Sequence, residues 1–92
     1  MYYVYFIKSK KTHEIYVGST NRSPFERTTE HNNSSNQWAK GRKPFELLYY
    51  EEYACISDVR KREQFYKTGF GKEIKRKIVA YLKEKGIKPK QK

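Results

Sequence analysis

The sequence has little cysteine, little acidic charge and no long hydrophobic run. Its 92 residues include one cysteine, Cys55, which excludes an internal disulfide and a cysteine-based metal site. No apolar segment approaches the roughly 20 residues that cross a bilayer. The start of the chain, Met1-Tyr2-Tyr3, also lacks the basic region and apolar core of a signal peptide. We therefore expect an intracellular, cytoplasmic protein without a membrane partner.

Basic residues, by contrast, are abundant. Lys and Arg number 21 against 10 Asp and Glu, which gives a formal net charge of +11. So high a charge on a short chain opposes compactness by self-repulsion and indicates a polyanionic partner. Nucleic acid is the first candidate, and an anionic membrane surface or an acidic protein is the second. A soluble basic domain without such a partner is the remaining alternative.

The length is that of one domain. We expect a single domain over residues 1–86, followed by a basic tail over residues 87–92. No internal repeat or linker divides the chain, and nothing in the sequence implies an oligomer.

Aromatic and β-branched residues dominate two runs, residues 2–7 and 14–18, which a short polar segment separates. This pattern predicts an antiparallel hairpin. With a turn centred on Lys10-Lys11, Tyr5 would lie opposite Tyr16, their Cβ atoms about 4.5–5.5 Å apart. Two facing tyrosines are either a packed aromatic pair or a pair of catalytic groups, and the pattern alone leaves both open.

A third strand is predicted over residues 45–53. Phe45, Leu47 and Tyr49 would line one of its faces, and Leu48 and Tyr50 the other. Apolar groups on both faces indicate a sheet that is covered on two sides. We therefore expect an α/β domain, with a small, mainly antiparallel three-stranded sheet flanked by about three helices.

The first predicted helix begins at Ser23-Pro24-Phe25-Glu26, a capping signature, and runs to about His31. Arg27 and His31 are four residues apart and therefore share a face. A further helix, over residues 72–85, would pack through Ile74, Ile78, Tyr81 and Leu82, with Gly86 as its C-terminal cap.

The helix between them would run from Ser57-Asp58 to about Lys67. It places Glu63 on the same face as the apolar Val59 and Tyr66. A carboxylate at such a position is costly to bury unless it is paired or bound to a cation. The alternative is a surface Glu63 that forms an ordinary ion pair with Lys67 four residues later.

Residues 32–43 are predicted to be a polar loop that carries Trp38 among basic residues. The tryptophan can stack on a base while its neighbours hold phosphates, or it can anchor the loop to the domain. The candidate nucleic-acid-binding residues are Arg22, Trp38, Lys40, Arg42 and Lys43.

Several of these residues occur in the order typical of one enzyme family. Tyr3-Val4-Tyr5 and Tyr16-Val17-Gly18, followed by Arg27, His31 and Glu63, resemble the GIY-YIG nucleases. The resemblance runs from Tyr2 to about Gly71. It is strongest to small stand-alone members, which are similar to the N-terminal nuclease module of the bacterial excision-repair endonuclease. Tyr3 replaces the first Gly of the family pattern, and Val17 replaces its Ile.

The resemblance implies a hydrolase, namely a metal-dependent endonuclease that cleaves DNA phosphodiester bonds. Such an enzyme would be structure-directed or weakly sequence-specific, would act in DNA repair or recombination, and would use a recruiting protein for its targets. The implied catalytic residues are Tyr5, Tyr16, Arg27, His31 and Glu63. Glu63 would bind a single Mg²⁺ or Mn²⁺ ion, Arg27 would grip the phosphate, and a tyrosine with a lowered pKa would be the general base.

Two positions depart from the family pattern. Many members carry an Asn near the end of the catalytic region, where this chain has Thr68-Gly69-Phe70-Gly71-Lys72. The repair-endonuclease branch has a Lys after the second triplet, where this chain has Ser19. A non-catalytic nucleic-acid-binding module on the same scaffold is therefore the main alternative, and an adaptor for an acidic protein is a third hypothesis.

Overall fold

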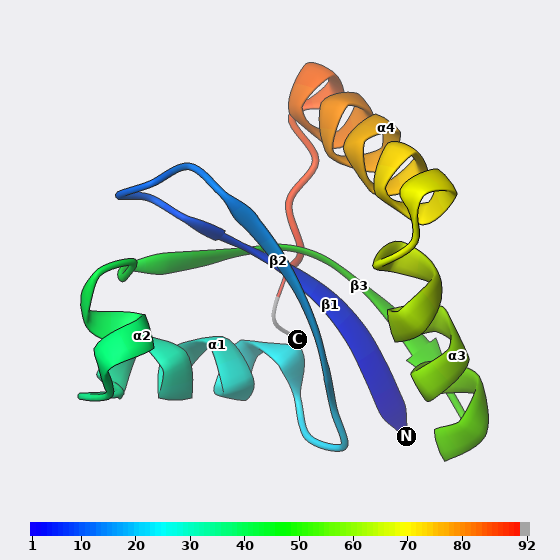
Figure 1. Ribbon diagram of the computed structural model, residues 1–92, viewed down its shortest axis with the longest axis horizontal. Coiled ribbons are helices and arrows are strands. Elements are labelled where there is room, and N and C mark those ends of the chain that lie inside the picture. The colour runs from blue at the N-terminus through cyan, green and yellow to red at the C-terminus, as the bar shows by residue number, and fades with distance from the viewer. Residues whose placement is uncertain (91–92) are drawn as a thin grey trace.

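The fold is built on a three-stranded antiparallel sheet with helices on both faces (Figure 1). The computed structural model describes residues 1–90. Its strands are β1 (Tyr2–Ser9), β2 (Ile15–Thr20) and β3 (Phe45–Tyr53), and they lie side by side in the order β2-β1-β3. The predicted α/β class, the sheet and the bounds of the third strand are thus confirmed.

The register of the hairpin differs from the prediction. Tyr5 pairs with Gly18, and Tyr16 pairs with Ile7, so the two tyrosines are not opposite each other. The connection is longer than a turn at Lys10-Lys11 allows, because Ser9 N donates to Glu14 O (3.0 Å) and closes a wider loop. Since the shift is two residues, Tyr5 and Tyr16 still point to the same face.

β3 does not alternate as predicted either. It pairs with β1 through a register shift between Phe6 and Ile7, the sign of a β-bulge. The bulge places Leu48 and Tyr49 together on one face, whereas Phe45, Leu47 and Tyr50 pack on the other. The prediction that Tyr49 shares a face with Phe45 was wrong, because a bulge interrupts the period of two.

Two helices cover the face that carries Tyr5. α1 (Pro24–Asn33) starts at the predicted cap, where Ser23 Oγ accepts from Phe25 N (3.2 Å). α2 (Gln37–Lys40) is a short helix in the segment predicted to be a loop, and Asn36 Oδ1 caps it by accepting from Ala39 N (2.8 Å). The core on this face consists of Tyr5, Ile7, Ala39 and Phe45.

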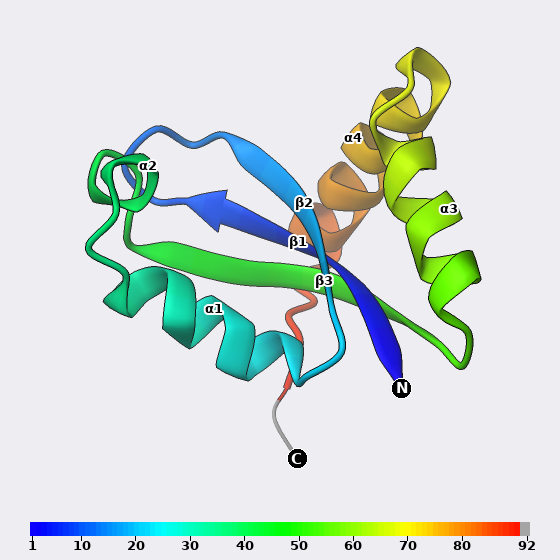
Figure 2. The same cartoon turned by 60° about the horizontal axis from the view of Figure 1, so that its bottom comes forward.

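The opposite face is covered by α3 (Ile56–Tyr66) and α4 (Gly69–Lys85), which lie together away from α1 (Figure 2). Val59 and Tyr66 of α3 pack on Val4 and Phe6, and Ile74 and Ile78 of α4 pack against this core, as predicted. Tyr81 is exposed, so its assignment to the apolar stripe was wrong. Gly86 ends α4 in the left-handed conformation that favours glycine (φ 66°).

A largely covered carboxylate, that of Glu51, joins β3 to α3. The Glu51 side chain is 11% exposed and accepts hydrogen bonds from the hydroxyls of Tyr49, Tyr53 and Tyr66 and from Arg62 Nε (2.9 Å). Burial raises the pKa of Glu51, but these four donors together lower it below its ordinary value. Burial and the same carboxylate raise the pKa of Tyr49 to about 12. The network therefore holds an ionised Glu51 against the C-terminal half of α3, which supplies Arg62 and Tyr66.

Residues 87 and 88, which follow α4, fold back toward the rest of the domain. Ile87 N donates to Leu82 O (3.0 Å), and Lys88 Nζ lies 3.3 Å from Glu46 Oε1, so the expected tail begins by folding back. Its last residues, 91–92, lie outside the described part. Cys55 is exposed at the start of α3. None of the helices within residues 1–90 has the length and apolar character needed to cross a membrane.

We predict that Gly71→Ala destabilises the domain by about 1–3 kcal/mol or more, because the added Cβ would lie 1.7 Å from the backbone oxygen of Phe65. Gly69→Ala, two residues earlier in α4, meets nothing within 4 Å and should change stability by less than about 1 kcal/mol. Urea unfolding of both variants measures the difference. Equal stabilities would contradict the close packing of α3 on α4.

Candidate active site

An open cleft of about 460 Å³ follows β2, one of the two edge strands of the sheet, and we call it the edge cleft. Five consecutive β2 residues, 15–19, line it, although their side chains alternate between the two faces of the sheet. The cleft therefore joins the two helical layers around this edge. Its other lining residues are Tyr5, Ile7, Arg27, His31, Trp38, Glu63, Tyr66, Lys67, Lys72 and Lys75.

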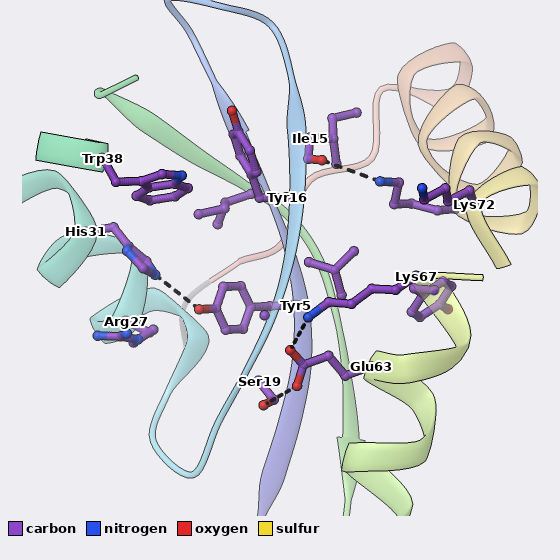
Figure 3. A pocket seen from close by; sticks show the side chains of 15 residues that line it. Tyr5, Ile15, Tyr16, Ser19, Arg27, His31, Trp38, Glu63, Lys67 and Lys72 are labelled. Atoms are coloured by element: carbon purple, nitrogen blue, oxygen red, sulfur yellow. Dashed lines mark hydrogen bonds and ion pairs between the residues drawn. The ribbon is translucent and has the colours of Figure 1, made fainter. Parts of the chain in front are cut away.

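Tyr5 lies at the middle of the cleft, with its hydroxyl 3.1 Å from Nε2 of His31 (Figure 3). The ring lies directly over Gly18, where an added Cβ would be 2.5 Å from the Tyr5 hydroxyl oxygen. Burial raises the pKa of Tyr5, and the charge of Arg27 offsets this only in part. The lowered tyrosine pKa expected from the sequence is thus wrong for Tyr5 in the protein alone, because burial outweighs the nearby cation.

Tyr16 shares the cleft but has different partners. Its hydroxyl accepts from Arg42 Nε (3.0 Å) and donates to Glu14 Oε2 (3.1 Å). Its ring meets that of Trp38 edge to face, with centroids 5.1 Å apart. Tyr5 and Tyr16 therefore lie in one cleft without forming the facing pair that the sequence predicted.

α1 supplies Arg27 and His31 on the same side of the cleft, as their spacing predicted. Arg27 Nη1 donates to Glu30 Oε1 (2.9 Å), and the same carboxylate accepts from Arg22 Nη2 (2.7 Å). Burial, followed by the charge of Arg27, lowers the pKa of His31 below 6.5. The neutral form of His31 is therefore favoured, and its ring can accept or donate a proton.

Glu63 reaches the cleft from α3, on the opposite side of Tyr5 from Arg27 and His31 (Figure 3). Its Oε1 accepts from Ser19 Oγ (2.7 Å) and its Oε2 from Lys67 Nζ (3.0 Å). Burial raises the pKa of Glu63, but these two hydrogen bonds together lower it. The predicted ion pair with Lys67 is therefore present, and the ionised carboxylate of Glu63 also lines the cleft with a side chain 23% exposed.

The candidate nucleic-acid-binding residues are more scattered. Trp38 alone among them lines the cleft; it stacks on Phe45, with centroids 5.3 Å apart, and remains 37% exposed. Arg42 lies over the Trp38 ring, and Lys43 Nζ donates to Ser34 O (3.0 Å). Arg22 pairs with Glu30, and Lys40 is exposed on α2. Trp38 thus anchors its segment and still presents part of its ring.

Other cleft residues were missed from the sequence. Ser19 holds Glu63, and Lys72 and Lys75 line the cleft from α4. The spacing of Arg27 and Glu30 was a readable signal for their ion pair, because residues three apart on a helix are neighbours. The α4 lysines had no such signal, since their position depends on how α4 packs beside β2.

The side chains that line the cleft allow a metal site with a single carboxylate ligand, Glu63. Within residues 1–90, no cluster of three or more His, Cys, Asp or Glu side chains can hold a metal ion. An ionised carboxylate such as Glu63, facing an open cleft, still fits Mg²⁺ or Mn²⁺, because these ions keep several waters and bind through one or two carboxylates plus phosphate oxygens.

We predict that Gly18→Ala destabilises the domain by about 1–3 kcal/mol, because the buried Tyr5 hydroxyl must move away from the new Cβ. The His31 pKa should also shift, since its contact with Tyr5 changes, and an NMR titration measures this. Gly41→Ala, which meets nothing within 4 Å, is the control. An unchanged His31 titration in Gly18→Ala would contradict the proposed packing.

A comparison against protein-family models matches residues 1–78 to the GIY-YIG catalytic domain. Comparisons with curated proteins and with solved structures each found no match. The family match includes every strand of the sheet and the helices that supply Arg27, His31 and Glu63. The chain therefore belongs to the GIY-YIG family and has its nuclease-type fold.

Proposed function

We propose that this protein is a metal-dependent endonuclease that hydrolyses DNA phosphodiester bonds. The observation that carries the proposal is the convergence of Tyr5, Arg27 and Glu63, from three separate elements, on one cleft beside Gly18. Family membership supports a nucleic-acid substrate and a divalent cation. The net charge of +11 supports binding to a polyanion.

Arg27 and Glu63 would divide the electrostatic work of the reaction. Arg27 presents a guanidinium that can bind phosphate oxygens in place of Glu30 and stabilise the charge of the transition state. Glu63 would hold the divalent cation in place of Lys67, and the bound ion would act as a Lewis acid toward the phosphate.

Tyr5 and His31 would act together as the general base. Because the pKa of Tyr5 is raised, a free phenolate is not formed near neutral pH. A neutral His31 whose Nε2 accepts from the Tyr5 hydroxyl allows Tyr5 to take a proton from the attacking water while passing its own proton to His31. Tyr16, held by Arg42 and Glu14, would position water or substrate.

We further propose structure-directed or weakly sequence-specific cleavage, as in DNA repair or recombination, with targets supplied through a recruiting protein. The proposal accommodates both departures from the family pattern. Thr68 caps α4 through a hydrogen bond from Gly71 N (3.0 Å), so this segment has a structural role here. Ser19 in turn fixes the Glu63 carboxylate.

A second function, a non-catalytic nucleic-acid-binding module, is favoured by one observation. Lys67 pairs with the carboxylate oxygen that a cation would need, so Glu63 is already neutralised in the protein alone. If this pair withstands millimolar Mg²⁺ or Mn²⁺, the cleft binds nucleic acid without cleaving it.

We predict that Glu63→Gln lowers nicking of supercoiled plasmid in Mg²⁺ or Mn²⁺ by at least about 100-fold, because a metal ion contributes several kcal/mol to transition-state stabilisation. Binding to a DNA duplex in EDTA, measured by fluorescence anisotropy, should remain as strong as in the wild type. Glu84→Gln, at an exposed site outside the cleft, makes the same charge change and should leave nicking unchanged. A wild-type protein that binds DNA but cuts none with either ion would establish the binding module instead.

We predict a cleavage rate that rises with pH through the His31 pKa, with its midpoint below the ordinary histidine value of 6.5. Protonated His31 cannot accept the Tyr5 proton, and burial and Arg27 hold its pKa below 6.5. His31→Gln should remove this acidic limb and slow cleavage by about 10²–10⁴-fold. His13→Asn, at the other histidine, should keep the limb; a midpoint above 6.5 in the wild type would refute the assignment.

A further inference from the structure

The edge cleft continues into a second hollow on α4. This hollow has a volume of about 380 Å³ and is lined by Ile15, Lys72, Lys75, Arg76, Val79 and Ala80. Ile15, Lys72 and Lys75 also line the edge cleft, so the two spaces are contiguous. We call this second space the lysine hollow.

Its charge is positive and largely uncompensated. Glu73 offsets Arg76, but neither Lys72 nor Lys75 takes part in an ion pair within residues 1–90. Lys75 is half-buried, and its Nζ donates to the carbonyl oxygen of Ile15 at 3.4 Å. Burial, together with the charges of Lys72 and Arg76, lowers the pKa of Lys75. An anion in the hollow would relieve this repulsion.

We propose that Lys72 and Lys75 form a second phosphate-binding subsite, which holds the DNA backbone beside the bond to be cleaved. This proposal rests on the proposed function and adds the path that the bound DNA takes across the protein. DNA would cross the edge of β2, from Arg27 and His31 on the α1 side to the lysine hollow on the α4 side (Figure 3).

Repeated phosphates fit this surface better than an acidic protein does. Residues three apart on a helix are neighbours, so Lys72 and Lys75 present two point charges side by side. They are contiguous with a cleft whose Arg27 and Glu63 suit phosphate chemistry, and a DNA strand extends from any phosphate in that cleft to further phosphates on either side.

The test compares charge-matched double variants in the Glu63→Gln background with EDTA, so that DNA binds without being cut. Fluorescence anisotropy with a short labelled duplex gives affinity from about 50 to about 200 mM NaCl. For Lys72→Gln/Lys75→Gln we expect about tenfold weaker binding at the lower salt concentration. The slope of log affinity against log salt should become shallower by about 1 to 2.

Lys61→Gln/Lys77→Gln is the control, because it removes the same charge from exposed positions that line neither the cleft nor the hollow. Lys72→Arg/Lys75→Arg should keep the wild-type slope, and thermal melts should show that each variant is folded. If Lys75→Gln fails to fold, the single variant Lys72→Gln, at an exposed position, still gives the slope of log affinity against log salt.

Equal slopes in the two double Gln variants would overturn the subsite, and so would a lack of saturable DNA binding at low salt. Polyglutamate that displaces the duplex as well as unlabelled DNA does would overturn it in favour of an acidic protein partner. These outcomes are independent of catalysis. If the wild-type protein cleaves no DNA, the proposed enzyme is refuted. The subsite is tested separately, by the slopes of log affinity against log salt.

Discussion

The candidate site depends on the position of β2 at the edge of the sheet. α1 lies on one face and α3 on the other, and their side chains meet around this edge, where both line the edge cleft. Gly18 makes the meeting close, because it has no side chain to separate the Tyr5 ring from the strand. Ser19, the next residue, points to the opposite face and holds Glu63. Gly18 and Ser19 therefore connect the part of the site on the α1 face, around Tyr5, with the part on the α3 face, around Glu63.

This arrangement requires that α3 keep its place on the sheet. The Glu51 network supplies a directional constraint that apolar packing alone does not, because its carboxylate bonds to Tyr66 and Arg62 of α3. Removing one partner of this part-buried pair is destabilising, since the remaining charge is left without its partner. Tyr66 also packs edge to face on Phe6 of β1, with centroids 4.9 Å apart. The helix that carries Glu63 is thus fixed to both β1 and β3.

The sequence predicted what local patterns determine. The bounds of β3, the cap of α1 at Ser23 and the left-handed Gly86 follow from strand propensity and capping chemistry, which act over a few residues. The two-sided sheet was also predictable, because β3 carries apolar residues at consecutive positions, which supply both faces whatever their exact alternation. Resemblance to the family identified Tyr5, Arg27 and Glu63, and the structure brings these three into one cleft.

The remaining features depend on interactions that a local pattern does not contain. The hairpin register depends on a loop that uses a positive φ at His13 and hydrogen bonds to Ser9 Oγ. The bulge near Leu48 is visible only in the pairing with β1. The α4 lysines reach the cleft because Gly71 lets α4 pack against the end of α3, a contact between elements that no helical period reports.

Two ion pairs explain how charged side chains can lie close together in the cleft in the absence of a ligand. Glu30 neutralises Arg27, and Lys67 neutralises Glu63. Neither side of the cleft therefore carries a charge without a partner, which would be costly to bury. A phosphate must therefore compete with Glu30 for Arg27, and a cation must compete with Lys67 for Glu63. Each pair is partly exposed, and such pairs are weak because water screens their charges, so exchange for a phosphate or a divalent ion is energetically accessible. Lys72 and Lys75 have no carboxylate to exchange among residues 1–90, and they attract an anion without that competition.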